Sequence, residues 1–173
     1  MNSTDEMLQN MISNHGDSIM DSSRKGNVLL VFLRHFGCTF CKEALKELSG
    51  LRSSEMIKNA ELILVHMSTE EIASKYFEKY HLEDLPRVSD PECRFYRHFG
   101  LSKGTFNQLF GFRSWIRGIE AGIIKGYGFG RQIGDGFQMP GVFLISKGRV
   151  LSEYKHKYAS DKPDYLSMVN CFS

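Results

Sequence analysis

An uninterrupted apolar stretch over residues 28–33 is followed, five residues on, by the first cysteine of the pair Cys38 and Cys41. A stretch this short and continuous is typical of a strand buried on both faces of a sheet. From Cys41 to Leu48 the apolar residues recur at i, i+3, i+4 and i+7, which predicts an amphipathic helix with Cys38 near its N-cap and Glu43 on its solvent side. The pair is therefore expected at a strand–turn–helix junction.

The same alternation of strand and helix continues along the chain. A second apolar run at residues 61–67 predicts another buried strand, and a helical stripe over 72–80 follows a segment, 68–71, that fits a capping box. Strand, helix, strand, helix is the order of a sheet covered by helices. The remaining expected elements are a short, loosely held helix within residues 3–22, a helix begun by Asp90 and ended by Gly100, a helix over 105–119 with Phe106 and Leu109 inward, a glycine-rich loop over 121–136, a hairpin of strands at 142–145 and 150–154, and a final helix over 162–169.

Length and composition fit a globular chain with a core of useful size. The chain has 173 residues, of which 42% are hydrophobic and 24% charged, and a net charge of +2, which gives no reason to expect nucleic acid or an anionic membrane as a partner. Its start lacks the basic and apolar pattern of a secretion signal, and its apolar runs fall far short of the roughly 20 residues of a membrane span. We therefore expect a cytoplasmic protein with an N-terminal helical extension, residues 1–24, and a main domain, residues 25–173.

The cysteine pair carries the chemistry that we expect. The thiolate is the nucleophilic form of cysteine, and the unpaired N–H groups of a helix N-terminus, together with nearby cations, favour it. Cys38 has this position, and Arg34 and His35 just before it are expected to add positive potential. With two residues between them, Cys38 and Cys41 are expected within disulfide reach, so that one sulfur attacks a substrate and the other resolves the mixed disulfide. We interpret Cys38 as the attacking thiol.

Other interpretations of the pair stay open. A C-x-x-C motif also supplies half of a zinc site, but the histidines and the other cysteines form no second half with the usual spacing, and we expect neither a metal nor another cofactor. The pair can instead be an inert structural pair, or switch the conformation of a non-catalytic redox sensor or binding module. Cys93, in the first turn of an expected helix, is interpreted as a small buried hydrophobe, and Cys171 lies near the end of the chain without an assigned role.

Two features resemble the thioredoxin superfamily. One is the segment Gly37-Cys38-Thr39-Phe40-Cys41 between a buried strand and a helix, and the other is Met139-Pro140 just before the strand at 142–145. In that superfamily a cis-proline precedes a strand and faces the active-site sulfurs, so the resemblance implies this role for Pro140. The segments 89–96 and 134–144 are similar to recurrent blocks of the peroxiredoxin-like family, also called the AhpC/TSA-like group. The resemblance covers about residues 25–170.

This resemblance implies an α/β protein of thioredoxin-like fold, in its peroxiredoxin-type variant, with a central mixed β-sheet and helices on both faces. It implies an antioxidant oxidoreductase that cycles a Cys38–Cys41 disulfide, takes electrons from a cellular dithiol such as thioredoxin, and reduces protein disulfides or small peroxides. Met139, Pro140 and Arg131 are the residues that we expect on the substrate side.

The chain departs from both relatives. The peroxiredoxin pattern P-x-x-x-T-x-x-C places the peroxidatic cysteine at Cys41, its threonine at Cys38 and its proline at Arg34, so that both supporting residues are missing. The buried carboxylate that thioredoxins carry in the strand is replaced by Phe32. Proton transfer to a resolving thiol then needs water or another group, and the two relatives disagree on which sulfur attacks.

Overall fold

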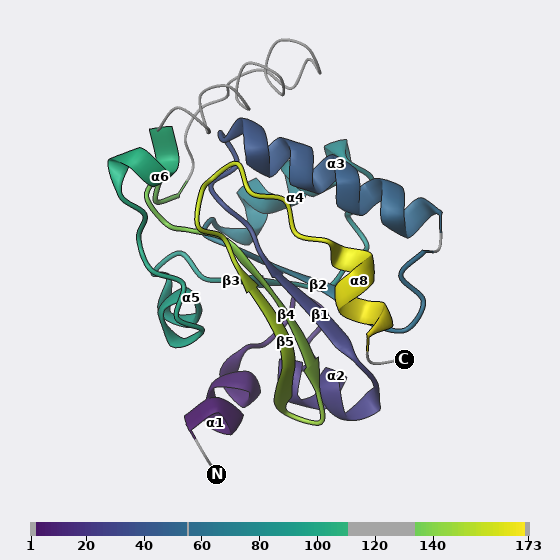
Figure 1. The fold of residues 1–173 in the computed structure, drawn as a ribbon. Coiled ribbons are helices and arrows are strands. Elements are labelled where there is room, and N and C mark those ends of the chain that lie inside the picture. The colour runs from purple at the N-terminus through teal and green to yellow at the C-terminus, as the bar shows by residue number, and fades with distance from the viewer. Residues whose placement is uncertain (1–2, 55, 111–133, 172–173) are drawn as a thin grey trace.

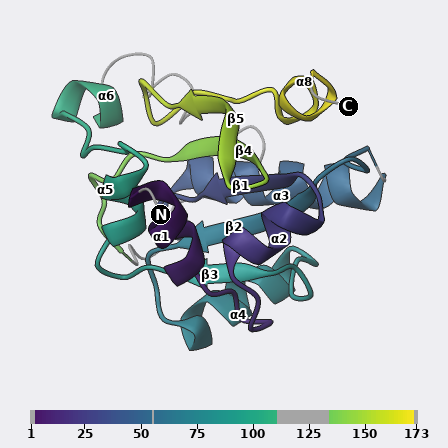
Figure 2. The same cartoon turned by 90° about the horizontal axis from the view of Figure 1, so that it is seen from below.

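The fold is built on a five-stranded mixed sheet with the strand order β3-β2-β1-β4-β5 (Figure 1). The computed structural model describes residues 3–54, 56–110 and 134–171. The strands are β1 (Val28–Phe32), β2 (Glu61–His66), β3 (Arg87–Ser89), β4 (Gly141–Ser146) and β5 (Arg149–Lys155). The parallel pairs are β1–β2 and β2–β3, whereas β1–β4 and the hairpin β4–β5 are antiparallel. The four predicted strands, β1, β2, β4 and β5, are confirmed, whereas the three-residue strand β3 was not predicted. Figure 2 shows the five strands side by side from β5 to β3.

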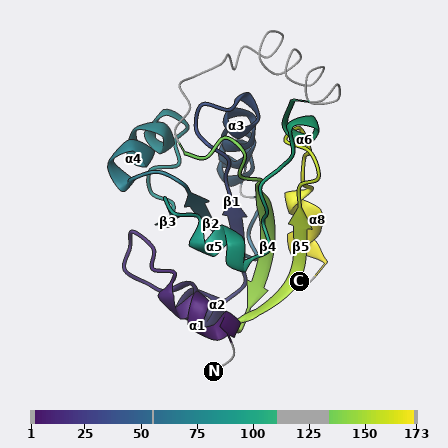
Figure 3. The same cartoon turned by 90° about the vertical axis from the view of Figure 1, so that its left-hand side faces the viewer.

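Helices cover both faces of this sheet, as expected. The described helices are α1 (Ser3–Asn10), α2 (Ile19–Lys25), α3 (Thr39–Ser53), α4 (Glu70–Lys79), α5 (Arg94–His98), α6 (Phe106–Phe110) and α8 (Tyr165–Asn170). Successive residues of β1 point to opposite faces, so Leu30 and Phe32 share a core with α1, α2 and α5, whereas Leu29 and Val31 share one with α3, α4 and α8. Figure 3 shows α1 and α2 at one end of the sheet and α3 and α6 at the other. Within the described part of the chain, no helix has the length and apolar character needed to cross a membrane.

The N-terminal segment is held firmly, and the expectation of one loosely held helix is wrong. It forms two short helices joined by a turn in which Gly16 has a φ of +93°. Leu8, Met11 and Ile19 are fully buried against the sheet. The turn interrupts the helical periodicity of the sequence, but the apolar side chains on either side of it still pack into one core.

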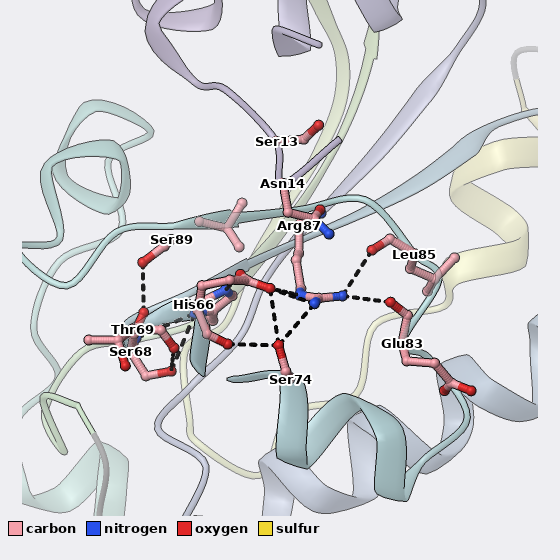
Figure 4. Close-up of polar contacts among 12 residues, drawn as sticks. Ser13, Asn14, His66, Ser68, Thr69, Ser74, Glu83, Leu85, Arg87 and Ser89 are labelled. Atoms are coloured by element: carbon pink, nitrogen blue, oxygen red, sulfur yellow. Dashed lines mark hydrogen bonds and ion pairs between the residues drawn. The ribbon is translucent and has the colours of Figure 1, made fainter. Parts of the chain in front are cut away.

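A buried arginine, Arg87, joins this N-terminal turn to β3 and α4 (Figure 4). Its backbone exchanges two hydrogen bonds with Asn14, at 2.8 and 2.9 Å. Its guanidinium donates to Glu70 Oε1 at 2.7 Å, to the Glu83 carbonyl at 2.8 Å and to Ser74 Oγ at 3.2 Å. The sequence analysis did not single out this residue, because its partners come from three separate segments.

Two helix starts differ from the expected ones. The predicted capping box is not formed, because the Ser68 hydroxyl lies against the His66 ring at 3.4 Å and Thr69 is the N-cap of α4 without a side-chain cap bond. At α5 the N-cap position belongs to Cys93, with a φ of +53°. Asp90 nevertheless caps this helix from outside, since its carboxylate accepts the N–H groups of Arg94, Phe95 and Tyr96 at 2.9, 2.8 and 3.3 Å.

The expected helix over 105–119 is described only in its first part, α6. Leu109 is buried, as expected, but the prediction for Phe106 is wrong because its side chain is 68% exposed. Most of the glycine-rich loop and the rest of this helix lie outside the described residues. The last helix, α8, begins after Asp164, whose carboxylate accepts the Ser167 N–H at 2.9 Å and so caps it.

Candidate active site

Cys38 lies where β1 leads into α3, at the N-cap of that helix, as the sequence predicts. Its N–H donates to the His35 carbonyl at 3.0 Å, which closes the turn, and its carbonyl accepts the Lys42 N–H at 3.1 Å. The side chain is 8% exposed. The sulfur is therefore buried at the positive end of a helix dipole, where β1 leads into α3.

The Arg34 side chain is the cation beside this sulfur. Arg34 is only 6% exposed, and its Nη1 donates to Cys38 Sγ at 2.8 Å. Its Nη2 donates to the backbone carbonyl of Gly136. The contact is a hydrogen bond from a charged donor to the sulfur, which is the stronger kind of hydrogen bond.

The Gly136 carbonyl, which accepts the second hydrogen bond of Arg34, lies in a segment that is itself held in place. Residues 134–139 run along the connection between α5 and α6, residues 101–104, and are joined to it by several bonds. These are Gln138 Nε2 to the Leu101 carbonyl at 2.7 Å, Met139 N–H to the Ser102 carbonyl at 3.2 Å, Gly104 N–H to the Phe137 carbonyl at 2.7 Å, and an ion pair of Lys103 with Asp135 at 2.7 Å. The Arg34 guanidinium is thus oriented by two acceptors, the Cys38 sulfur and the Gly136 carbonyl.

Cys41 belongs to the same core cluster as Cys38 but has a different polar contact. It is 3% exposed, and its thiol donates to the Arg34 carbonyl at 3.4 Å. Burial, and after it the charge of Cys38, raises the pKa of Cys41 well above its usual range. Both cysteines are free, and their sulfurs are not at disulfide distance, which corrects the expectation that the two side chains face each other. The reason is that Cys41 begins the apolar stripe of α3 and points into the core.

His35 does not supply the positive charge that the sequence suggests. Burial, and next the charge of Arg34, lowers its pKa to about 4, so the ring is neutral near pH 7. Its Nδ1 is buried without a hydrogen-bond partner. Of the two residues expected to act on the sulfur electrostatically, Arg34 alone carries a positive charge.

Of the other predicted site residues, Pro140 lies beside Cys41, Met139 belongs to a separate small cluster with Leu109 and Ala159, and Arg131 is outside the described chain. Met139 and Pro140 are buried, and Pro140 lines the same cavity, of about 40 Å³, as Arg34 and Cys41. The peptide bond before Pro140 is trans, so the cis-proline that the resemblance implies is wrong. The Pro140 carbonyl accepts the His156 N–H at 3.3 Å, at the start of β4. Arg131 falls outside the described residues.

The two remaining cysteines are separate from this site. Cys93 is buried, and burial, together with the carboxylate of Asp90, raises its pKa to about 11, as suits a small hydrophobe in the core. Cys171 is exposed. Among the residues with described positions, no group of three or more His, Cys, Asp or Glu is arranged to hold a metal ion.

One charged pair at the site is not evident from the sequence. Glu43, expected on the solvent side of α3, is 6% exposed, and its Oε1 lies 2.7 Å from Lys162 Nζ. Glu43 lines the cavity beside Cys41, and so do Lys162 and His156 from the segment after β5. Local periodicity carries no signal for this burial, because the segment that covers Glu43 comes from the far end of the chain.

The chain is similar to known proteins in sequence and in fold. The family model "AhpC/TSA antioxidant enzyme" matches residues 46–160, a stretch that begins just after the cysteine pair. The human protein Peroxiredoxin-like 2A is 26% identical over 155 residues, which are 84% of this chain and 62% of that protein. The chain thus spans less than two thirds of the length of this relative.

Solved structures show the same fold. Peroxidoxin BcpB from Mycobacterium tuberculosis superposes with a TM-score of 0.63 at 15% identity, covering 94% of this chain and 92% of that one. A cysteine mutant of Peroxiredoxin Q from Xanthomonas campestris gives 0.63 at 14% identity, covering 94% and 90%. The predicted α/β thioredoxin-like fold is confirmed.

Proposed function

We propose, from the premise that this chain belongs to the AhpC/TSA antioxidant enzyme family, that it is a thiol-dependent oxidoreductase acting through Cys38 and Cys41. Membership in the family supports a thiol redox role in general. The further steps are the attack by Cys38, the resolution by Cys41 and the return of electrons from a dithiol donor such as thioredoxin. A reducing compartment such as the cytoplasm would supply that donor.

The contact of Arg34 Nη1 with Cys38 Sγ, at 2.8 Å, is the observation that carries this proposal. A sulfur at a helix N-cap that also accepts a bond from a buried guanidinium has the two features that activate a thiol. The Cys38 thiolate attacks a disulfide or the terminal oxygen of a small peroxide. The products are a mixed disulfide and a thiol in the first case, or a sulfenic acid and an alcohol or water in the second.

Cys41 then attacks the sulfur of Cys38 and closes the intramolecular disulfide. In the reduced structure its side chain points away, so this step needs a rotation of one or both cysteines. The backbone allows it, since Cα atoms three residues apart on a helical turn lie roughly 5 Å from each other, inside the range that disulfides span. The burial of Cys41 supports this division of roles over one in which Cys41 is the peroxidatic residue, because a sealed, protonated thiol is a poor first nucleophile.

Two assays with a thioredoxin system and NADPH test the proposal: reduction of a protein disulfide and consumption of hydrogen peroxide. We expect Cys38→Ser to abolish turnover in whichever assay the wild type is active. We expect Cys41→Ser to react once and then stop as a trapped mixed disulfide or sulfenic acid. Full turnover of either variant would exclude the two-cysteine cycle. A wild type that is oxidised but never turns over would instead identify a redox sensor.

A further inference from the structure

The buried thiol of Cys41 poses a problem of proton transfer, which arises only within the function proposed above. To resolve a mixed disulfide, Cys41 must attack as a thiolate, yet its thiol donates to the Arg34 carbonyl and is closed off in the core. The neighbouring strand offers Phe32 and no acid or base. A proton acceptor must therefore come from another element.

A cavity beside Cys41 gives the proton a way out of the core. Its volume is about 40 Å³, enough for two or three water molecules at roughly 10–15 Å³ each. Two nitrogens of residues that line it, Arg34 Nε and His156 Nδ1, are buried without a hydrogen-bond partner in the protein. Leaving such atoms unsatisfied costs about 1–3 kcal/mol each, so water in a cavity lined by these two residues would be stabilised wherever it reaches them.

The Glu43 carboxylate is part of the wall of this cavity. It is 6% exposed and forms its ion pair with Lys162, whose ammonium reaches the surface. Only the Glu43 side of this pair is buried, since Lys162 is 40% exposed, so the carboxylate bears a desolvation cost that a half-exposed partner offsets only in part. Glu43 stands two residues after Cys41 on α3, and both residues line the cavity.

We propose that Glu43 accepts the Cys41 proton through water in this cavity. In the mixed disulfide between Cys38 and a substrate thiol, the Cys41 thiol gives its proton to a water molecule, and a proton passes from the water to Glu43. The Cys41 thiolate attacks Cys38 Sγ, the bond between the two cysteines forms, and the bond to the substrate sulfur breaks. The substrate thiolate leaves with the electron pair and is protonated by Glu43 through water, which restores the carboxylate.

The charges around the cavity favour Glu43 over His156 as the acceptor. Transfer to Glu43 moves one negative charge from oxygen to sulfur, whereas transfer to His156 creates two charges where there were none, which costs more in a site with little water. The other titratable and charged side chains that face the cavity are Arg34, Glu47, Asp161, Lys162 and Tyr165. Arg34 stabilises a thiolate on its neighbours, and Lys162 keeps Glu43 ionised until the proton arrives.

The reagent 5,5′-dithiobis(2-nitrobenzoic acid) separates the two steps in the full chain carrying Cys171→Ser, which removes the exposed thiol. The first release of thionitrobenzoate reports the attack by Cys38, and the second reports resolution by Cys41. We expect Glu43→Gln to leave the first rate unchanged and to slow the second by about 100-fold near pH 7, as loss of a general base does. The second rate of Glu43→Gln should rise with pH in proportion to hydroxide, whereas that of the unsubstituted protein levels off.

Further variants distinguish Glu43 from the other titratable residues. Glu71→Gln, which changes an exposed carboxylate on α4 that pairs with Lys75, should not change the second rate, and Glu43→Asp should restore part of it. Equal slowing by Glu71→Gln, slowing by His156→Asn without an effect of Glu43→Gln, or an unchanged pH profile in Glu43→Gln would each overturn the assignment. Absence of the first release in the unsubstituted protein would refute the proposed function itself and is thus a separate result. A thermal melt shows whether each variant is folded, and if Glu43→Gln is not, the pH profile of Glu43→Asp decides.

Discussion

The Arg34 guanidinium donates a hydrogen bond to the carbonyl of Gly136, 102 positions further along the chain. This bond links the end of β1 to the segment that leads into β4, and the same guanidinium holds the Cys38 sulfur. The position of the cation therefore depends on packing far from the cysteine motif. The cysteine pair can be recognised in the sequence, but the bond to Gly136 that orients Arg34 cannot.

Removal of the cation should slow the chemistry of Cys38. We expect Arg34→Met to lower the rate at which iodoacetamide alkylates Cys38 near pH 7 by about tenfold, since one such interaction is worth about 1.4 kcal/mol or more. Arg34→Lys should be nearly as slow, because an ammonium cannot bond the sulfur and the Gly136 carbonyl with two parallel donors. Mass spectrometry of the Cys38 peptide measures both rates.

The exposed Arg94 provides the control for this experiment. Its guanidinium pairs with Glu92 at the surface at 3.6 Å, so Arg94→Met should leave the alkylation rate of Cys38 unchanged. An equal rate in Arg34→Met and the wild type would show that the contact of Arg34 with the sulfur does not activate it.

The thiols should also differ in the order of their modification. In the folded protein, Cys171 is exposed, whereas the other three cysteines are buried. Of these three, Cys38 accepts the bond from Arg34, and Cys41 and Cys93 have raised pKa values. We expect a short pulse of iodoacetamide at neutral pH to label Cys171 first, Cys38 next, and the other two only when urea unfolds the chain. Labelling of Cys41 ahead of Cys38 would favour the assignment of Cys41 as the attacking residue.

The parts of the fold that the sequence predicts are those decided by neighbouring residues. The strand β1 is evident because an unbroken apolar run is buried from both sides, and the N-cap position of Cys38 follows from the periodicity of the helix after it. The same reasoning predicts one loose helix at the N-terminus, where the structure has two firmly packed ones. The turn at Gly16 breaks the period, although Leu8 and Ile19 enter the same core.

The parts of the site that the sequence does not predict depend on segments far apart in the chain. Glu43 has the spacing of a solvent-facing residue, and only the arrival of Lys162 and the residues before α8 buries it. Cys41 likewise has the spacing of a disulfide partner for Cys38, but its place in the apolar stripe turns its sulfur into the core. Spacing fixes where a Cα atom lies on a helix, whereas packing fixes where the side chain points.

The buried ring of His66 should make the fold sensitive to acid. His66 is fully buried near Arg87 (Figure 4), and its Nε2 lies 3.6 Å from Glu70 Oε2. Burial lowers its pKa from 6.5 to about 4. Between these two pH values the unfolded chain binds a proton at this residue and the folded chain does not. The free energy of unfolding should therefore fall as pH drops from about 6.5 to 4, by about 1–3 kcal/mol from this ring.

Urea unfolding at a series of pH values isolates this contribution by comparison with His66→Gln. Other groups, His35 and His156 among them, titrate in the same range, so the difference between the two proteins is the informative quantity. We expect that difference to shrink on acidification, because the variant has no proton to gain at this position. A difference that is constant from pH 7 to 4 would mean that His66 titrates alike in the folded and unfolded chains.

The close approach of the 101–104 segment to β4 leads to a prediction about Gly141, the first residue of that strand. A Cβ atom placed there would lie 2.6 Å from Leu101 Cδ2 and 3.2 Å from the Tyr154 carbonyl oxygen, and Leu101 is buried and has little room to move. We expect Gly141→Ala to lower the free energy of unfolding by about 1–3 kcal/mol in urea titrations, as overpacking does. Gly26→Ala, where a Cβ meets nothing within 4 Å, is the control and should change stability little. Because the same segment holds the Gly136 carbonyl, Gly141→Ala should also slow alkylation of Cys38, which links the packing of β4 to the chemistry of the thiol.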